Sequence, residues 1–306
     1  MNSSFNTLGT LCEFIKNELN GLYPEREIQS LTDMIISHTL GIPKHEIHIE
    51  KGKIINEINK LRITEMVNEL RLGKPVQYII GYTDFFGLSL RVSPDVLIPR
   101  PETEELVKWI IDDHAGRSPV LLDIGTGSGC IAIALKKNLP QSEIHACDVS
   151  PASLNLAREN ARSQKVYINF FHHDISSSSL SESYRNQSNN SSGISKMQGI
   201  SFLYDIIVSN PPYIPLKEKR FMNINITGFE PENALFVPDE DPLIFYRNIA
   251  GFGLNHLKKN GQIYFEVHEK SGQRVKRLLE GSGYRDINIR KDINGKIRMI
   301  KCTNNG

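Results

Sequence analysis

The chain has 306 residues, enough for about two domains, and a hydrophobic share of 39% and a charged share of 23% are typical of a globular protein. Its formal net charge is +1, so its overall field would not hold a polyphosphate, which argues against a strong nonspecific nucleic-acid binder. No stretch approaches the roughly 20 apolar residues that cross a bilayer, and we expect no membrane partner.

The cysteines are few, scattered, and form no CxxC pair. They are Cys12, Cys130, Cys147 and Cys302. This spacing favours a reduced, cytoplasmic protein over a disulfide framework or a zinc site. The first 20 residues include acids and lack a continuous apolar run, so we expect no signal peptide there.

Residues 1–73 read as a small helical domain. Apolar residues recur at three- or four-residue steps, as one face of an amphipathic helix requires. The predicted stripes are Leu8, Leu11, Ile15 and Leu19; Ile28, Leu31 and Ile35; and Ile55, Ile58, Met66 and Leu70. Residues 74–100 then alternate and are rich in Tyr, Phe, Val and Ile, which predicts a β-hairpin linker.

Residues 101–306 alternate between helical and strand patterns. Repeated strand–helix units predict an α/β fold with a mostly parallel, doubly wound sheet covered on both faces. The last two strand-like segments, "RDINIR" and "KIRMIKC", predict an antiparallel edge pair. A polar, serine-rich stretch from Ser176 to Ser195 interrupts this pattern and predicts a surface loop.

A glycine-rich turn follows the first buried strand of this domain, in "LLDIGTGSGC". Asp123 ends the strand, and Gly125, Gly127 and Gly129 lead into a helix. Glycines let a backbone approach a ligand closely. The pattern is G-x-G-x-G; it matches neither G-x-G-x-x-G nor a P-loop, so two common phosphate-binding interpretations are disfavoured.

Polar residues stand at the ends of four predicted strands, namely Asp123, Asp148, Asp174 and Asn210. In an open parallel sheet such positions meet at one edge, where ligands bind. Asp148, some twenty residues after the glycines, can accept hydrogen bonds from ribose hydroxyls, and Asp174 would lie near an adenine. The pair His172-His173 has no third ligand at metal spacing, so no metal site is predicted.

The G-x-G-x-G turn with Asp148 resembles the cofactor site of class I S-adenosylmethionine-dependent methyltransferases, whose sheet has seven strands with the last antiparallel. "NPPY", Asn210 to Tyr213, resembles the motif of amino-methyltransferases, which act on amide or exocyclic amine nitrogens. An amide nitrogen is a poor nucleophile because its lone pair is delocalised. The Asn210 side-chain oxygen and the Pro211 carbonyl could each accept one N–H, so that catalysis works by orientation. Pro212 would stiffen the loop and Tyr213 would stack on the flat group.

Nearly the whole chain resembles the peptide chain release factor N5-glutamine methyltransferase family, through "IPRPETE", "GFEPENALF" and the helical front domain. The resemblance implies transfer of a methyl group from S-adenosylmethionine to the glutamine of the Gly-Gly-Gln motif in class 1 release factors, with S-adenosylhomocysteine as product. It implies that residues 1–73 dock the substrate and residues 101–306 bind the cofactor. The implied catalytic residues are Asn210, Pro211 and Tyr213, and Pro212 joins them at the substrate. The candidate cofactor residues are Asp123, Gly125, Thr126, Gly127, Ser128, Gly129, Asp148, Asp174, Ile175 and Asn210. At Ile175 some members carry a larger, aromatic residue.

Two other functions remain open on the residues alone. One is an adenine N6-methyltransferase acting on DNA or RNA, although no DNA-reading domain is evident and no stable DNA binding is expected. The other is a translation-factor binding module that keeps the fold without catalysis. Arg100, Glu102 and Thr103 could line the cofactor entrance or simply begin a helix. The basic stretch 269–301 could meet an acidic partner or be a solvated face.

Overall fold

The structure, a computed structural model, describes residues 5–176 and 203–306. These form two compact units. The helical unit comprises Met1–Tyr82 and Asn223–Phe229, and the sheet unit comprises Thr83–Met222 and Glu230–Gly306. Apart from Ser176, the predicted serine-rich loop lies outside the described residues.

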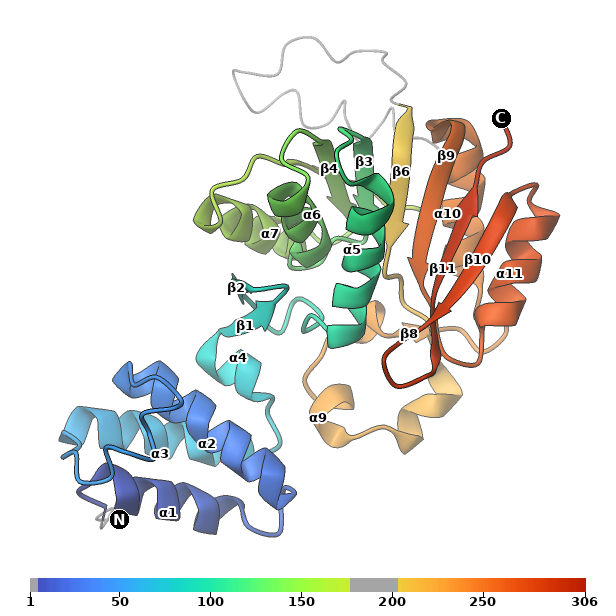
Figure 1. Cartoon of the computed structure of the whole chain (residues 1–306). Helices are drawn as coiled ribbons and strands as arrows, with labels where there is room; N and C mark the ends of the chain where they lie inside the picture. Colours follow the sequence, from blue (N-terminus) through green and yellow to red (C-terminus); the bar gives the residue numbers. More distant parts are fainter. Residues whose placement is uncertain (1–4, 177–202) are drawn as a thin grey trace. The chain divides into compact units, whose positions relative to one another are not determined.

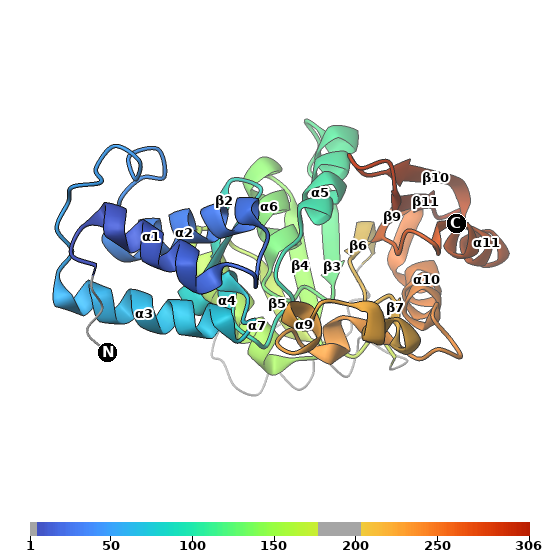
Figure 2. The ribbon, with the colours of Figure 1, turned by 90° about the horizontal axis from the view of Figure 1, so that it is seen from below.

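The helical unit packs its helices around one apolar core. Figure 2 shows the three longest helices of this unit side by side. Its helices are α1 (Leu8–Leu19), α2 (Glu25–Leu40), α3 (Glu57–Arg71), α4 (Val76–Ile80) and α9 (Ile224–Thr227). The Thr7 side chain accepts a hydrogen bond from the Thr10 N–H and begins α1. The predicted stripes of α1 and α2 are buried, which confirms them.

The third predicted stripe was wrong at Ile58, whose residue surface is 64% exposed. The buried face of α3 is formed by Lys60, Ile63, Val67 and Leu70. Five residues advance an α-helix by about 140°, so Ile58 and Ile63 point in different directions. Ile58 therefore lies on the outer side of α3.

The predicted hairpin is shorter than residues 74–100. Its strands are β1 (Tyr82–Phe85) and β2 (Leu88–Arg91), and "VQYII" forms α4 instead. Periodicity does not distinguish a short apolar run in a helix from one in a strand. Gly81, with φ of 77°, ends α4 in the left-handed conformation and turns the chain into β1.

The sheet unit contains a seven-stranded sheet in the order β10-β11-β9-β6-β3-β4-β5 (Figure 1). Its strands are β3 (Val120–Ile124), β4 (Glu143–Asp148), β5 (Asn169–His172), β6 (Tyr204–Ser209), β9 (Leu257–Glu266), β10 (Arg285–Lys291) and β11 (Ile297–Thr303). The strands β9, β6, β3, β4 and β5 run parallel to one another, and β11 runs antiparallel to β9 and to the edge strand β10. The predicted parallel sheet and antiparallel edge pair are confirmed.

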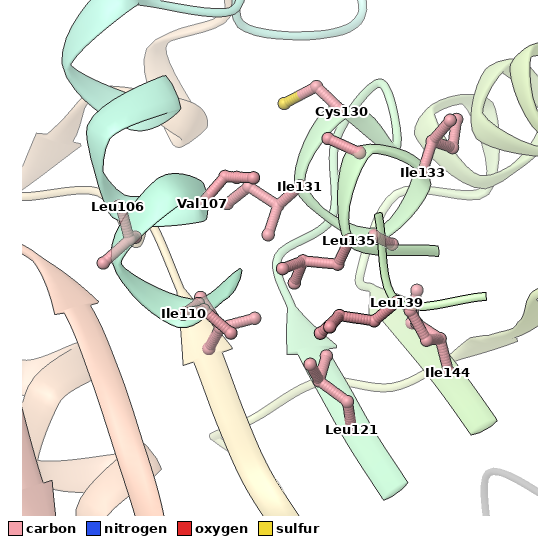
Figure 3. Packing of buried hydrophobic residues seen from close by; sticks show 14 of the residues in the cluster. Leu106, Val107, Ile110, Leu121, Cys130, Ile131, Ile133, Leu135, Leu139 and Ile144 are labelled. Atoms are coloured by element: carbon pink, nitrogen blue, oxygen red, sulfur yellow. The ribbon is translucent and has the colours of Figure 1, made fainter. Parts of the chain in front are cut away.

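Helices cover both faces of this sheet. The helices are α5 (Pro101–His114), α6 (Cys130–Asn138), α7 (Pro151–Ser163), α10 (Ile244–His256) and α11 (Gly272–Gly281). Leu121 packs with α5 and α6 in one core, as Figure 3 shows, whereas its neighbour Leu122 packs with α10 and α11 in the other. Strand side chains alternate between faces, so β3 is apolar on both sides.

Because the strands from β9 to β5 run parallel to one another, their carboxyl ends share one edge of the sheet. Beyond that edge, the chain after β6 forms the short strand β7 (Ile214–Pro215), which pairs with β8 (Phe236–Val237). Two 3-10 turns, η1 (Leu216–Phe221) and η2 (Glu232–Ala234), flank them. The "NPPY" loop is therefore held at β6 on one side and at β7 on the other. Among the described residues, no helix has the length and apolar character needed to cross a membrane.

Candidate functional site

The glycine turn between β3 and α6 is held in shape by backbone hydrogen bonds. The N–H groups of Gly125 and Thr126 donate to the Cys147 carbonyl of β4 at 2.9 and 3.0 Å. Gly125, Gly127 and Gly129 have φ of 73°, 54° and 82°, a region that favours glycine. The three predicted glycines are thus explained by backbone conformation.

The turn has an open side and a packed side. A Cβ added at Gly125 or Gly127 would meet nothing within 4 Å, whereas one at Gly129 would lie 3.1 Å from the Ala157 Cβ. Gly125 is exposed and Gly127 is partly exposed, but Thr126 and Ser128 are buried. A ligand can therefore approach the backbone at Gly125 and Gly127, while Gly129 is needed for packing.

Asp123 lies behind the turn and has no exposed surface. Its Oδ2 accepts a hydrogen bond from the Thr126 hydroxyl at 2.7 Å. Burial raises the pKa of Asp123 to about 7, and the nearby Asp148 charge acts in the same direction. In this structure Asp123 shapes the turn.

Asp148, at the end of β4, holds the turn from its other side. Its Oδ2 accepts from the Gly127 N–H and its Oδ1 accepts from the Ser150 N–H, each at 2.9 Å. Burial raises the pKa of Asp148, and these two backbone bonds partly oppose that effect. The carboxylate keeps further lone pairs, so it can still accept a hydrogen bond from a ligand.

The end of β5 leads to two more candidates. Asp174 is exposed, and its Oδ1 accepts a hydrogen bond from the Ser176 N–H at 2.8 Å. Ile175 is partly buried and packs against the core that contains α10. A ring nitrogen of His172 lies 3.0 Å from the Val149 carbonyl oxygen. Within residues 5–176 and 203–306, no group of three or more His, Cys, Asp or Glu is arranged to hold a metal ion.

The "NPPY" loop is tied to a buried carboxylate that the sequence patterns did not reveal. Asn210 Nδ2 donates to the Thr103 Oγ1 at 3.2 Å, and the Thr103 hydroxyl donates to Glu266 Oε2 at 2.6 Å. The Tyr213 hydroxyl donates to Glu266 Oε1 at 3.0 Å. Burial raises the pKa values of both Glu266 and Tyr213. Asn210 and Tyr213 are partly exposed, while Pro211 is buried.

Glu266 ends β9 in "IYFEVHE", and an acid at the end of an apolar strand is a sequence signal for a residue near the site. The same pattern predicted Asp123 and Asp148. Its link to Thr103 spans 163 residues, and no local periodicity contains such information. Thr103 lies in the first turn of α5, which Pro101 begins, so the helix-start interpretation is right and Thr103 also reaches the loop.

An ion pair between Arg100 and Glu230 links two sequence segments that carry the family resemblance. The Arg100 guanidinium lies 2.5 Å from the Glu230 Oε1, and the Glu230 side chain is only 2% exposed. This ion pair therefore connects the "IPRPETE" segment, which contains Arg100, to the "GFEPENALF" segment, which contains Glu230. Glu232 instead forms an exposed ion pair with Lys219.

Several side chains of the basic stretch 269–301 have internal partners. Arg298 pairs with Asp292 and Lys301 pairs with Asp113, at 3.3 and 2.8 Å. The Arg290 guanidinium lies over the Trp109 ring, 4.0 Å from its centroid. These contacts favour a structural role for this part of the stretch.

The strand order of the seven-stranded sheet and the glycine turn after β3 match the class I methyltransferase fold. Residues 103–225 match the family model "Methyltransferase small domain", and residues 13–81 match "PrmC N-terminal domain". A solved methyltransferase from Pyrococcus furiosus, 17% identical, aligns over 82% of this chain and all of its own with a TM-score of 0.50, which supports the fold.

Curated relatives narrow the class. A release factor glutamine methyltransferase from Bacteroides thetaiotaomicron is 41% identical over 96% of this chain and 99% of its own length. Another, from Flavobacterium psychrophilum, is 39% identical over 92% of this chain and 94% of its own. The chain belongs to the release factor glutamine methyltransferase family.

Proposed function

We propose that this protein transfers a methyl group from S-adenosylmethionine to the N5 amide of the Gly-Gly-Gln glutamine in class 1 release factors, in the cytoplasm. The observation that carries this proposal is the "NPPY" loop at the carboxyl end of β6, beside a glycine turn with an open face. The names of the relatives support the same substrate class.

The residues fit a nucleoside cofactor. A Cβ at Gly125 or Gly127 would fill open space in front of the turn, which suits close approach of a ligand to the backbone. Asp148 has lone pairs to spare for ribose hydroxyls, and Asp174 and Ile175 have exposed surface for the adenine side. Bound there, S-adenosylmethionine would supply an electrophilic methyl group on a positively charged sulfur. Asp123, Thr126, Ser128 and Gly129 would support the turn from behind.

The loop would orient the glutamine amide. Asn210 Oδ1 and the Pro211 carbonyl would each accept one N–H, which leaves the nitrogen lone pair directed at the methyl group. Pro212 would limit movement of these two oxygens, and the Tyr213 ring would cover the planar amide. Holding the reacting atoms in line lowers the entropic part of the activation barrier for methyl transfer. No strong base is needed for this effect.

The helical unit, with the hairpin, would help dock the release factor. Three of its apolar side chains, Ile54, Ile58 and Leu61, are 82%, 64% and 66% exposed. Ile58 and Leu61 lie three residues apart on α3, so they are neighbours on one helix surface that a protein partner could cover.

The test is incubation with labelled S-adenosylmethionine and a purified class 1 release factor, with DNA in a separate reaction. A release factor whose Gly-Gly-Gln glutamine is replaced by alanine is the control. We expect label on the glutamine peptide alone. Label on DNA with an unlabelled release factor would instead support the adenine methyltransferase.

A further inference from the structure

Glu266 lies at the centre of a hydrogen-bonded group behind the "NPPY" loop. Its residue surface is 1% exposed, so a substrate cannot reach it directly. Its two carboxylate oxygens accept from the hydroxyls of Thr103 and Tyr213, and Thr103 in turn accepts from the Asn210 amide. The group joins the start of α5, the end of β9 and the chain after β6.

The hydrogen bonds of this group run in one direction. With Glu266 ionised it carries no hydrogen, and the hydroxyls of Thr103 and Tyr213 both donate to it. A hydroxyl has one hydrogen, and that of Thr103 is used in the hydrogen bond to Glu266. Towards Asn210, the Thr103 oxygen can only accept, and only the amide NH2 can donate to it. Asn210 Oδ1 is consequently turned away from Thr103.

We propose that Glu266 and Thr103 are positioning residues for methyl transfer, which set the Asn210 amide so that its oxygen, and not its NH2, is offered to the substrate. This rests on the proposed function, in which Asn210 Oδ1 accepts a substrate N–H. A side-chain amide can rotate by 180° about its last bond, and its two ends have nearly the same shape. A reversed Asn210 would present a donor to a donor.

The same carboxylate also fixes the far end of Tyr213. Its hydroxyl is held at Glu266 Oε1, so the ring that would cover the substrate amide has a fixed direction. One buried carboxylate thus sets both the acceptor and the stacking surface. Loss of the Thr103 hydroxyl should disturb only the first of them.

Thr103→Val tests this directly, because it removes the hydroxyl and keeps the shape of the side chain. We expect kcat for release factor methylation to fall about 10- to 100-fold, the scale of a displaced reacting group. The KM for the release factor, the calorimetric affinity for S-adenosylmethionine and the melting temperature should stay close to those of the wild type. Thr103→Ser, which keeps the hydroxyl, should restore turnover.

Thr303→Val is the matched control. Thr303 is also a buried threonine of the sheet unit, and it pairs with Gln262, four residues before Glu266. That places it about 13 Å away along the strand. Its kcat should remain at the wild-type level.

The double variant separates positioning from a general structural role. In an Asn210→Ala background, Thr103→Val should cause no further loss of single-turnover rate, because the amide that it positions is gone. An equal loss in both backgrounds would overturn the proposal, as would wild-type kcat in Thr103→Val. If Thr103→Val fails to fold, Glu266→Gln replaces it as the test. The glutamine amide can donate to Thr103 and so reverse the direction of the hydrogen bonds that lead to Asn210. Wild-type kcat in Glu266→Gln would equally contradict the proposal. Failure of the proposed function is distinct, because the wild type itself would then leave the glutamine unmethylated.

Discussion

At the residue scale, the acids at the strand ends have different environments although the sequence places them alike. Asp123 is fully buried behind the glycine turn, whereas Asp148 is partly exposed and binds the turn backbone. Glu266 is buried and binds two hydroxyls. Only Asp148 among these three keeps exposed surface for a ligand.

Burial of Asp123 should make the stability of the cofactor-free protein depend on pH. Its pKa is about 7 in the folded protein, against an ordinary value of 3.8. The folded state therefore binds this proton more tightly, and its contribution to the free energy of unfolding falls as pH rises from about 4 to about 7. Asp123→Asn, which stays neutral, should flatten this fall by roughly 2 to 4 kcal/mol. Urea unfolding of both proteins across that range measures it, and parallel pH curves would show that Asp123 ionises normally.

At the element scale, the glycines of the turn meet two different requirements, which are open space for a ligand and close packing against helices. Gly125 has open space in front of it, so its left-handed φ is the only structural demand. Gly129 combines a left-handed φ with a close approach to Ala157 and Ile133 of two helices. Gly125 therefore leaves room for a ligand, and Gly129 allows the turn to pack against the helices.

Alanine substitutions should distinguish these positions. Gly129→Ala adds overpacking of about 1 to 3 kcal/mol to a left-handed backbone strain of about 1 to 2 kcal/mol. Gly125→Ala carries only the strain, but its methyl group occupies the open side. We expect the lower melting temperature in Gly129→Ala and, by calorimetry, the larger loss of S-adenosylmethionine affinity in Gly125→Ala. The reverse order would show that the open side is not where the cofactor binds.

Local patterns predict most of the elements but not the contacts between them. The parallel sheet, its antiparallel edge and the glycine turn followed from periodicity and strand-end residues. The prediction is wrong at Ile58 because a step of three or four residues does not by itself keep side chains on one helix face over several turns. "VQYII" is too short for its apolar pattern to distinguish a helix from a strand. The bond between Thr103 and Glu266 depends on packing of α5 against β9, which tertiary structure alone brings together.

At the scale of the whole molecule, the sheet unit would carry the chemistry and the helical unit would supply surface for the release factor. Exposed apolar side chains at Ile58 and Leu61 are the feature of α3 that the core does not explain. Each would contribute to binding by leaving water in a complex.

Replacing both by serine should weaken docking without changing the chemical step. Burial of such side chains is worth about 1.5 to 3 kcal/mol each, so we expect the KM for the release factor to rise at least about tenfold with kcat unchanged. Ile293→Ser is the control, since Ile293 is 90% exposed and belongs to the sheet unit. An unchanged KM in the double variant would remove this face of α3 from the docking surface.

The orientation of a glutamine amide by the "NPPY" loop is tested most directly by Asn210→Ala, assayed with labelled S-adenosylmethionine and a class 1 release factor. The loop is predicted to act on the transition state, so the variant should lose about 100- to 1,000-fold in kcat, the scale of one lost oxyanion-type contact. Its calorimetric affinity for the cofactor should stay largely intact. Near-normal turnover in Asn210→Ala would contradict the mechanism.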